Sequence, residues 1–428
     1  MEKDTIKKAI IKFEETIPKN VFEREIKIPK IPFEKAIVIV GPRRAGKTYY
    51  LYKVYNSVKN KKPVFLNFED NMIKDINNKE LNLIPEATTE LFGSKDFVFF
   101  LDEIQAVEGW ENFVVTLLNS RYEVYITGSN SKNLSIDIAT SLRGKALPFV
   151  LLPLSFNEFL NFKNFDVIEN IEYSSKILQL KKLFNEYITY GGFPELVIAK
   201  EIELKNRLVN NYFDTLVYKD TIERNKIKNS KLVMITAKYL LNLYSNIFSI
   251  TAYENYLKSN KIPYSLEDIY QILSTLRNIY FISYVKQYSK SYKKSEYSKS
   301  KIYLIDTSYI KFIANENEDK GRILENVVFI ELFRRQGTIE NTKIFYYLTK
   351  KGKECDFVVE KNDKFQIIQV CYQLKENNKQ RELDAIFEAM HETKTNEGIL
   401  LTYDQEETIV KEGKKILIKP VWKWIIGK

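Results

Sequence analysis

The chain has 428 residues, of which 44% are hydrophobic and 14% aromatic, a composition typical of packed globular domains. Its formal net charge of +10 at pH 7 permits a nucleic-acid partner but does not establish one. Two cysteines, Cys355 and Cys371, exclude a disulfide framework and a four-cysteine zinc site, which is typical of a reducing compartment. The single histidine, His391, argues against a histidine metal centre and a Ser-His-Asp hydrolase.

No stretch of the sequence has the length and polarity of a membrane segment. The longest apolar run, ALPFVLLPL at 146–154, contains two prolines and is too short to cross a bilayer. The opening residues MEKDTIKKAIIKFEE are charged and helical in pattern, without the apolar centre of a secretory signal. We therefore expect a cytoplasmic protein with no membrane partner.

Apolar runs alternate with helical patterns in the first third of the chain. The runs are IVIV (37–40), VFLNF (64–68), FVFFL (97–101), VYIT (124–127) and ALPFVLL (146–152). Short apolar runs separated by helices predict a parallel sheet that is covered on both faces. We expect this α/β core over residues 31–152, after a helical extension at residues 1–30.

The rest of the chain divides into three further regions. Residues 153–230 are mainly helical in pattern, with a Gly-Gly-Phe-Pro break at 191–194. Residues 231–310 have three helical patterns and then the strands YFISYV and KIYLID, an order typical of a winged helix. Residues 311–428 alternate helix and strand again, which predicts a second α/β unit.

A phosphate-binding loop follows the first apolar run. Residues 41–48 match G-x-x-x-x-G-K-[ST] between a strand and a helix, so their backbone N–H groups can surround phosphate oxygens. Lys47 would reach the β- and γ-phosphates, and the Thr48 hydroxyl would bind Mg²⁺. The loop consists of Gly41, Pro42, Arg43, Arg44, Ala45, Gly46, Lys47 and Thr48.

Two acids end the run FVFFL. Asp102 is expected to join Thr48 at the Mg²⁺, and Glu103 to polarise the attacking water. The alternative is that both acids only cap the following helix. The sequence lacks the base-reading Asn/Thr-Lys-x-Asp element of GTPases, which favours ATP. The two motifs together predict Mg²⁺-dependent ATP hydrolysis.

Several further stretches resemble one family. GPRRAGKT, LNFED (66–70), LDEIQAVEGWENF (101–113), ITGSNS (126–131), LPLSFNEFL (152–160) and YGGFPE (190–195) are similar to archaeal and bacterial AAA+-related P-loop ATPases that carry a C-terminal PD-(D/E)XK nuclease-like domain. The resemblance covers essentially the whole chain. It implies an α/β fold with a P-loop AAA+-like parallel sheet core, a helical lid, a winged helix and a nuclease-like α/β domain.

The same resemblance implies two further catalytic residues. Ser129 or Asn130 would be the sensor of the γ-phosphate, although Asn130 could be a turn residue. Arg143 would be an arginine finger that acts on the ATP of a neighbouring subunit, which implies a homo-oligomer. Alternatively, Arg143 is a surface or salt-bridge residue.

A lysine- and tyrosine-rich hairpin is the candidate DNA surface. Its position as the wing after a recognition helix, and its lysines, favour contacts with phosphates that have little sequence preference. The alternative is a solvated hairpin tip. The candidate residues are Lys286, Lys290, Lys293, Lys294, Lys299 and Lys301, interleaved with Tyr288, Tyr292 and Tyr297.

The C-terminal region has a degenerate nuclease signature. Glu325 and Asp356 fit two acid positions of a nuclease, although Glu325 could make a helix-surface or interdomain contact. Gln369 and Cys371 stand where Glu-x-Lys is required, and Lys375 lies beyond the strand. We predict a nuclease-like fold without nuclease chemistry.

The combined prediction is an ATPase that acts with DNA as a motor or remodeller. The alternative is a signalling or defence switch whose nucleotide state gates a protein partner and which has no role on DNA.

Overall fold

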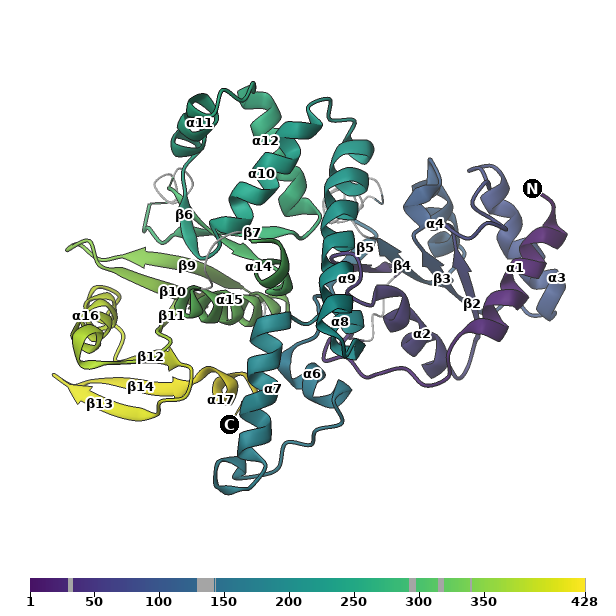
Figure 1. Ribbon diagram of the computed structural model, residues 1–428. Coiled ribbons are helices and arrows are strands. Elements are labelled where there is room, and N and C mark those ends of the chain that lie inside the picture. Colours follow the sequence, from purple (N-terminus) through teal and green to yellow (C-terminus); the bar gives the residue numbers. More distant parts are fainter. Residues whose placement is uncertain are drawn as a thin grey trace. The chain divides into compact units, whose positions relative to one another are not determined.

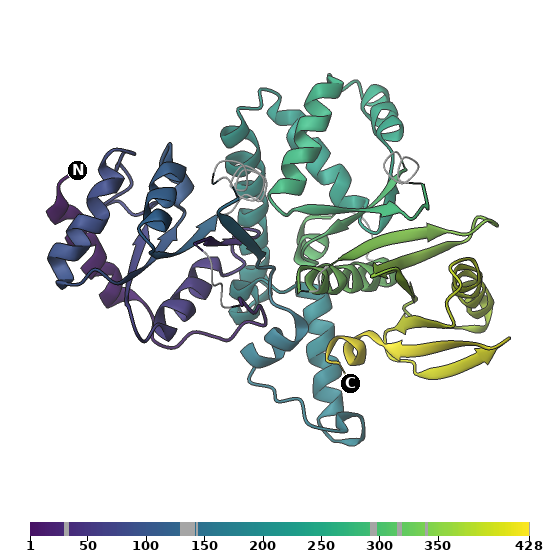
Figure 2. The ribbon, with the colours of Figure 1, turned by 180° about the vertical axis from the view of Figure 1, so that it is seen from behind.

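The computed structural model describes residues 1–29, 34–128, 142, 144–291, 298–314, 319–338 and 341–427 (Figure 1 and, from behind, Figure 2). The chain forms two units. One is Met1–Pro153 with Asn278–Tyr280, and the other is Leu154–Arg277 with Phe281–Lys428. Within these described ranges, no helix is long and apolar enough to cross a membrane.

The first unit is built on a five-stranded parallel sheet in the order β2-β3-β4-β1-β5. The predicted apolar runs form these strands, and β1 and β3 are buried along their whole length. Val40 lies opposite Gly128 and Asn67 opposite Asp102, so the carboxyl ends of four strands meet at one edge. The strands are β1 (Ala36–Val40), β2 (Lys62–Asn67), β3 (Phe97–Asp102), β4 (Glu123–Gly128) and β5 (Ala146–Val150).

The N-terminal helix belongs to the core of this unit. Its apolar residues recur at helical spacing, and Ile6, Ile10 and Phe13 are buried in one cluster with β1. The ring centroids of Phe13 and Phe65 are 5.6 Å apart. The segment expected as an extension therefore covers the sheet. The helices are α1 (Lys3–Thr16), α2 (Lys47–Ser57), η1 (Glu80–Asn82), α3 (Leu83–Phe92), η2 (Ile104–Ala106) and α4 (Trp110–Asn119).

The second unit begins with helices, as the pattern of residues 153–230 predicts. Ser155 caps the first of them in a capping box with Glu158, which sets where the helix begins. The helices up to residue 278 are α6 (Phe156–Phe162), η3 (Ile171–Tyr173), α7 (Ile177–Tyr190), α8 (Pro194–Ile198), α9 (Ile202–Thr215), the π-helix η4 (Leu216–Glu223), α10 (Ser230–Asn242), α11 (Ile250–Ser259) and α12 (Leu266–Asn278).

A mixed nine-stranded sheet forms the rest of this unit, in the order β13-β14-β12-β11-β10-β9-β7-β8-β6. The strands are β6 (Asn246–Phe248), β7 (Ile282–Gln287), β8 (Ser300–Leu304), β9 (Thr342–Leu348), β10 (Glu354–Lys361), β11 (Lys364–Val370), β12 (Glu397–Thr402), β13 (Glu407–Lys411) and β14 (Lys414–Pro420). Its helices are α14 (Ser308–Ile313), α15 (Lys320–Thr338), α16 (Glu376–Glu392) and α17 (Val421–Ile425).

This sheet runs through residue 310, where the sequence favoured a boundary between a winged helix and a nuclease-like domain. Strand β7 pairs in parallel with β9, with Lys286 opposite Phe345, and Tyr288 donates its backbone N–H to the Tyr346 carbonyl at 2.8 Å. Of the strands expected to form the wing of a winged helix, β7 therefore pairs with a strand of the region expected to be nuclease-like. All nine strands of this sheet belong to the second unit, together with the helices of Leu154–Arg277.

Helix α16 covers β10, β11 and β12, and both cysteines lie in the apolar core of this region. Burial raises the pKa of Cys371 to about 11 and that of Cys355 still further. Both thiols are therefore neutral core side chains at physiological pH.

Candidate active site

The phosphate loop leads from the carboxyl end of β1 into α2. Gly41 has a φ of 150°, and a Cβ atom there would lie 2.1 Å from the carbonyl oxygen of Leu151. Gly46, with a φ of 92°, adopts the left-handed conformation just before α2. A side chain would therefore clash at Gly41 and would be strained at Gly46, so both positions of the motif favour glycine. The loop places its N–H groups at the N-terminus of an eleven-residue helix, whose dipole favours an anion.

Lys47 lies within this loop and is 6% exposed. Its Nζ donates to the carbonyl oxygens of Gly41 at 3.2 Å and Pro42 at 3.0 Å. Arg43 is partly buried, whereas Arg44 is exposed and has a left-handed φ of 66°. The ammonium of Lys47 is therefore held at the loop, within reach of a phosphate that the loop would bind.

Asp102 ends β3 beside the loop and is 1% exposed. Its Oδ2 accepts from the Thr48 hydroxyl at 3.0 Å, and its Oδ1 accepts from the Thr127 hydroxyl. Burial raises the pKa of Asp102 to about 6, and the charge of Glu103 acts in the same direction, while the two hydroxyls and Lys47 oppose them. A carboxylate in this setting is stabilised by a nearby cation. Thr48 and Asp102 offer the oxygen ligands that Mg²⁺ prefers.

Glu103 follows in a left-handed conformation, with φ 54° and ψ 35°. Its backbone N–H donates to Thr127 Oγ1 at 3.2 Å, and its carboxylate accepts from the side-chain amide of Gln105. Non-glycine residues rarely adopt this conformation, and such strain is concentrated at functional sites. Because the chain turns sharply after β3, Asp102 is buried whereas Glu103 is partly exposed.

Thr127 and Gln105 were not predicted from the sequence. Thr127 is fully buried at the end of β4, and its one hydroxyl donates to Asp102 and accepts from Glu103. The only hint of Thr127 in the sequence is that it ends the apolar run VYIT, but the sequence does not show which strand lies beside β3.

Ser129, Asn130 and Arg143 fall outside the described residues, so the sensor and the arginine finger stay predictions.

The residues at this edge of the sheet fit a Mg²⁺-bound nucleotide. The loop supplies N–H groups and an ammonium, and Thr48 with Asp102 supplies oxygen ligands. Across the described ranges, no group of three or more His, Cys, Asp or Glu side chains is placed to hold a metal ion. Mg²⁺ usually completes its ligand shell with water and substrate phosphates, so two protein oxygens suffice.

Comparison with known proteins agrees with this geometry. Residues 33–160 match the family model of an AAA domain, and residues 181–320 and 320–424 match two domains of unknown function, DUF8612 and DUF4143. An uncharacterized protein of Methanocaldococcus jannaschii, MJ1544, is 40% identical over 393 residues, which cover 90% of this chain and 87% of that protein. The chain belongs to this family of AAA-domain P-loop ATPases.

A second relative extends the family to bacteria. An uncharacterized protein of Haemophilus influenzae is 31% identical over 399 residues, which cover 90% of this chain and 93% of that protein. Among solved structures, the Walker-type ATPase paby2304 of Pyrococcus abyssi matches 72% of this chain and 94% of its own, at 12% identity and a TM-score of 0.39.

Of the lysines predicted to bind DNA, Lys301 does not lie at the surface. Lys290 and Lys299 are exposed and Lys286 is partly buried, whereas Lys293 and Lys294 lie outside the described residues. Lys301 is 2% exposed, which corrects its assignment to the DNA-facing set. Its strand β8 is an interior strand of the sheet, and an ammonium buried there needs acidic partners.

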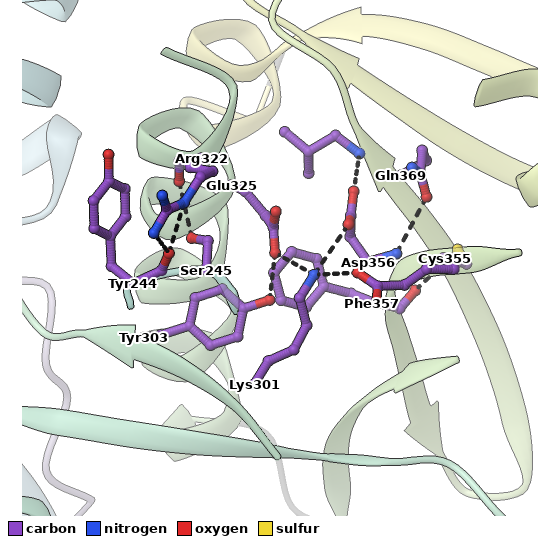
Figure 3. A network of polar contacts seen from close by, with 12 residues as sticks. Tyr244, Ser245, Lys301, Tyr303, Arg322, Glu325, Cys355, Asp356, Phe357 and Gln369 are labelled. Carbon is purple, nitrogen blue, oxygen red and sulfur yellow. Dashed lines mark hydrogen bonds and ion pairs between the residues drawn. The ribbon is translucent and has the colours of Figure 1, made fainter. Parts of the chain in front are cut away.

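Lys301 has three such partners, of which Glu325 and Asp356 are labelled in Figure 3. Its Nζ lies 2.7 Å from Glu325 Oε1, 2.7 Å from Glu354 Oε1 and 3.3 Å from Asp356 Oδ1. Tyr303 donates its hydroxyl to the same Glu325 oxygen at 2.6 Å. We call Lys301, Tyr303, Glu325, Glu354 and Asp356 the lysine cluster. It joins β8, α15 and β10.

Burial raises the pKa values of Glu325 and Asp356, and the Lys301 ammonium opposes this shift. Burial alone would lower the pKa of Lys301, but the surrounding acids outweigh it, and the pKa is raised well above its usual value. Lys301 is therefore the permanent cation of the cluster. The sequence correctly grouped Glu325 with Asp356. It missed Glu354, two residues before Asp356 on the same strand and hence on the same face.

The other positions of the degenerate signature are occupied by structural contacts. Gln369 accepts from the Asp356 N–H at 3.1 Å and donates to Glu382 at 2.8 Å. Cys371 is a buried thiol, and Lys375 is exposed at the start of α16. Neither Gln369 nor Lys375 provides a positive charge beside Glu325 and Asp356. Lys301 provides that charge instead.

We expect Lys301→Met to destabilise the protein in a pH-dependent way. Removing one partner of a buried ion pair costs about 3–5 kcal/mol, which corresponds to a fall in Tm of about 10 °C. The acids left behind have folded-state pKa values above their unfolded values, so the variant regains stability as pH falls through those values. Melting curves at pH 5.5 and 8.5 measure this, with the larger loss expected at pH 8.5.

The exposed neighbour provides the control. Lys299→Met removes the same charge two residues away and should change Tm by less than about 2 °C at either pH. An equal loss in both variants, or a loss in Lys301→Met that does not depend on pH, would contradict the assigned role of the lysine cluster.

Proposed function

We propose that the chain binds ATP at residues 41–48 and hydrolyses it with Mg²⁺. The observation that carries the proposal is the hydrogen bond of 3.0 Å between Thr48 and Asp102 at the mouth of a glycine-dependent phosphate loop. Lys47 would neutralise charge on the transferred phosphate. Glu103 would hold and polarise the attacking water, a role that its partly exposed side chain allows. Mg²⁺, when bound, supplies further charge neutralisation at the phosphate oxygens.

The sensor and the arginine finger complete the proposal. Ser129 or Asn130 would follow β4, the strand that places Thr127 against Asp102. Arg143 would act on the ATP of a neighbouring copy, so we propose a homo-oligomer as the hydrolysing form. Both roles rest on the resemblance to AAA+-related ATPases.

Substitutions at Glu103 and Lys47 separate binding from hydrolysis. Glu103→Gln should keep ATP bound while turnover falls by about a hundredfold or more, because the water loses its base but the loop is intact. Lys47→Ala should lose ATP binding. Binding of a fluorescent ATP analogue and phosphate release measure the two effects. Turnover like that of the native protein in Glu103→Gln would remove Glu103 from the catalytic role.

For the biological role, we propose an ATPase that acts with DNA as a motor or remodeller. The exposed Lys290 and Lys299, together with the charge of +10, support contacts with a phosphate backbone. The second candidate is a nucleotide-gated signalling or defence switch that acts on a protein partner. It is favoured by α12, the candidate recognition helix, whose first turn carries Glu267 and Asp268 and would repel a phosphate backbone.

Salt dependence distinguishes the two roles. Changing Lys290, Lys293, Lys294 and Lys299 together to Gln should weaken DNA binding about equally for different sequences and flatten the salt slope. The control changes Lys59, Lys95, Lys200 and Lys394, which are exposed elsewhere on the chain. An unchanged slope in the first variant, measured by fluorescence anisotropy, would favour the protein switch.

We also propose that the C-terminal region lacks metal-dependent nuclease activity. In a nuclease the acids bind Mg²⁺ and a lysine orients water. Here the lysine cluster already pairs its acids with an internal cation, and Gln369 is engaged with Glu382.

Incubation with single-stranded, duplex and branched DNA in Mg²⁺ or Mn²⁺ should therefore give no cleavage. The matched sample is Asp356→Ala. Cleavage by the native chain that Asp356→Ala abolishes would refute the proposal, whereas cleavage that persists in that variant would come from a contaminant.

A further inference from the structure

One guanidinium joins the phosphate loop to the segment that follows β5. Arg24 lies in the chain between α1 and β1 and is 9% exposed. Its Nη1 donates to the carbonyl oxygen of Ala45 at 2.8 Å, and its Nη2 donates to the carbonyl oxygen of Leu152 at 2.7 Å. Arginine suits this position because its rigid planar fork holds two separate acceptors at a fixed distance.

The phosphate loop also touches that segment directly. Leu151 donates its N–H to the Val40 carbonyl at 2.7 Å, and its own carbonyl lies where a side chain at Gly41 would be. Leu151 and Leu152 are therefore fixed against the start of the loop by Val40 and Gly41, and against its end by Arg24.

The chain leaves the first unit immediately afterwards, at Pro153. Leu154, the first residue of the second unit, donates its N–H to the Gly192 carbonyl at 2.8 Å and accepts from the Tyr187 hydroxyl at 3.1 Å. Gly192 in turn donates to Asp306 at 2.8 Å, just after β8. The connection is thus held on both sides of Pro153, whose ring restricts the backbone between them.

Peptide planarity links this arrangement to phosphate binding. The carbonyl of Ala45 and the N–H of Gly46 belong to one rigid peptide plane. Turning the Gly46 N–H towards a phosphate must therefore swing the Ala45 oxygen, which Arg24 holds. A change in the loop is passed by one side chain to the Leu152 carbonyl.

We propose that Arg24 is a positioning residue that couples the phosphate loop to the Leu152–Leu154 connection between the two units. This rests on the proposed binding of ATP. Arg24 orients the Ala45–Gly46 peptide so that its N–H can bind a phosphate. When a phosphate occupies the loop, the Ala45 carbonyl moves, and Arg24 transmits this movement to the Leu152 carbonyl. The nucleotide state is thereby conveyed to the second unit, where hydrogen bonds lead from Leu154 through Gly192 to Asp306.

The test measures binding and coupling separately. Donor and acceptor dyes are attached at Lys59→Cys and Val410→Cys, one exposed position in each unit, since Cys355 and Cys371 are buried. In Arg24→Met we expect ATP-analogue affinity to fall by no more than about tenfold, the effect of one hydrogen bond. The nucleotide-induced change in energy transfer should be lost.

Two further variants complete the design. Arg24→Lys keeps the positive charge but cannot donate to both carbonyls at once, so it should not restore the change in energy transfer. If Arg24→Met does not fold, Arg24→Lys alone tests the coupling. Arg322→Met is the matched control, because Arg322 likewise joins two backbone carbonyls, those of Asn242 and Tyr244, far along the chain from the phosphate loop. It should leave the change intact.

A native chain that binds the analogue without any change in energy transfer would overturn the coupling, as would an Arg24→Lys variant with the full native change. Failure of the native chain to bind the analogue at all would instead refute the proposed function.

Discussion

Three acidic side chains converge inside the second unit, and the structure around them depends on one ammonium. Lys301 comes from β8, Glu325 from α15, and Glu354 and Asp356 from β10. Burying these acids without a cation would cost several kcal/mol, so the three elements must meet at the lysine. This requirement ties β8, from the region predicted to be a winged helix, to α15 and β10, from the region predicted to be nuclease-like, and the strands of both regions lie in one nine-stranded sheet.

The chain stabilises buried acid in two different ways. At Asp102 the hydrogen-bond partners are the neutral hydroxyls of Thr48 and Thr127, and Lys47 compensates the charge only in part, because the pKa of Asp102 is still raised to about 6. That arrangement suits an exchangeable cation that arrives with a nucleotide. In the lysine cluster the cation is covalently part of the chain and cannot leave. Under the proposed function, the first arrangement would serve the turnover of ATP, whereas the second holds β8, α15 and β10 together.

The sequence predicted those features that depend on local pattern. The phosphate loop, the Asp102-Glu103 pair and the five apolar strands are contiguous motifs, and the structure has them where they were predicted. Lys301 was misassigned because it was grouped with a charged hairpin, although it heads KIYLI, a run whose other members are also buried. Arg24 carries no local signal, since its partners Ala45 and Leu152 lie far along the chain. Thr127 ends an apolar run, but the sequence does not give the strand order that places it beside Asp102.

The pairing of β7 with β9 also bears on how this family is divided. Residue 320 separates the two domains of unknown function, yet both sides of that point contribute strands to one sheet. Cutting the chain there would expose the edges of β7 and β9, and exposed strand edges promote aggregation. It would also separate Lys301 from Glu325. We therefore expect that neither half folds as an independent module. The two regions are expected to be inherited together, and substitutions at Lys301 to be matched by changes at Glu325 or Asp356.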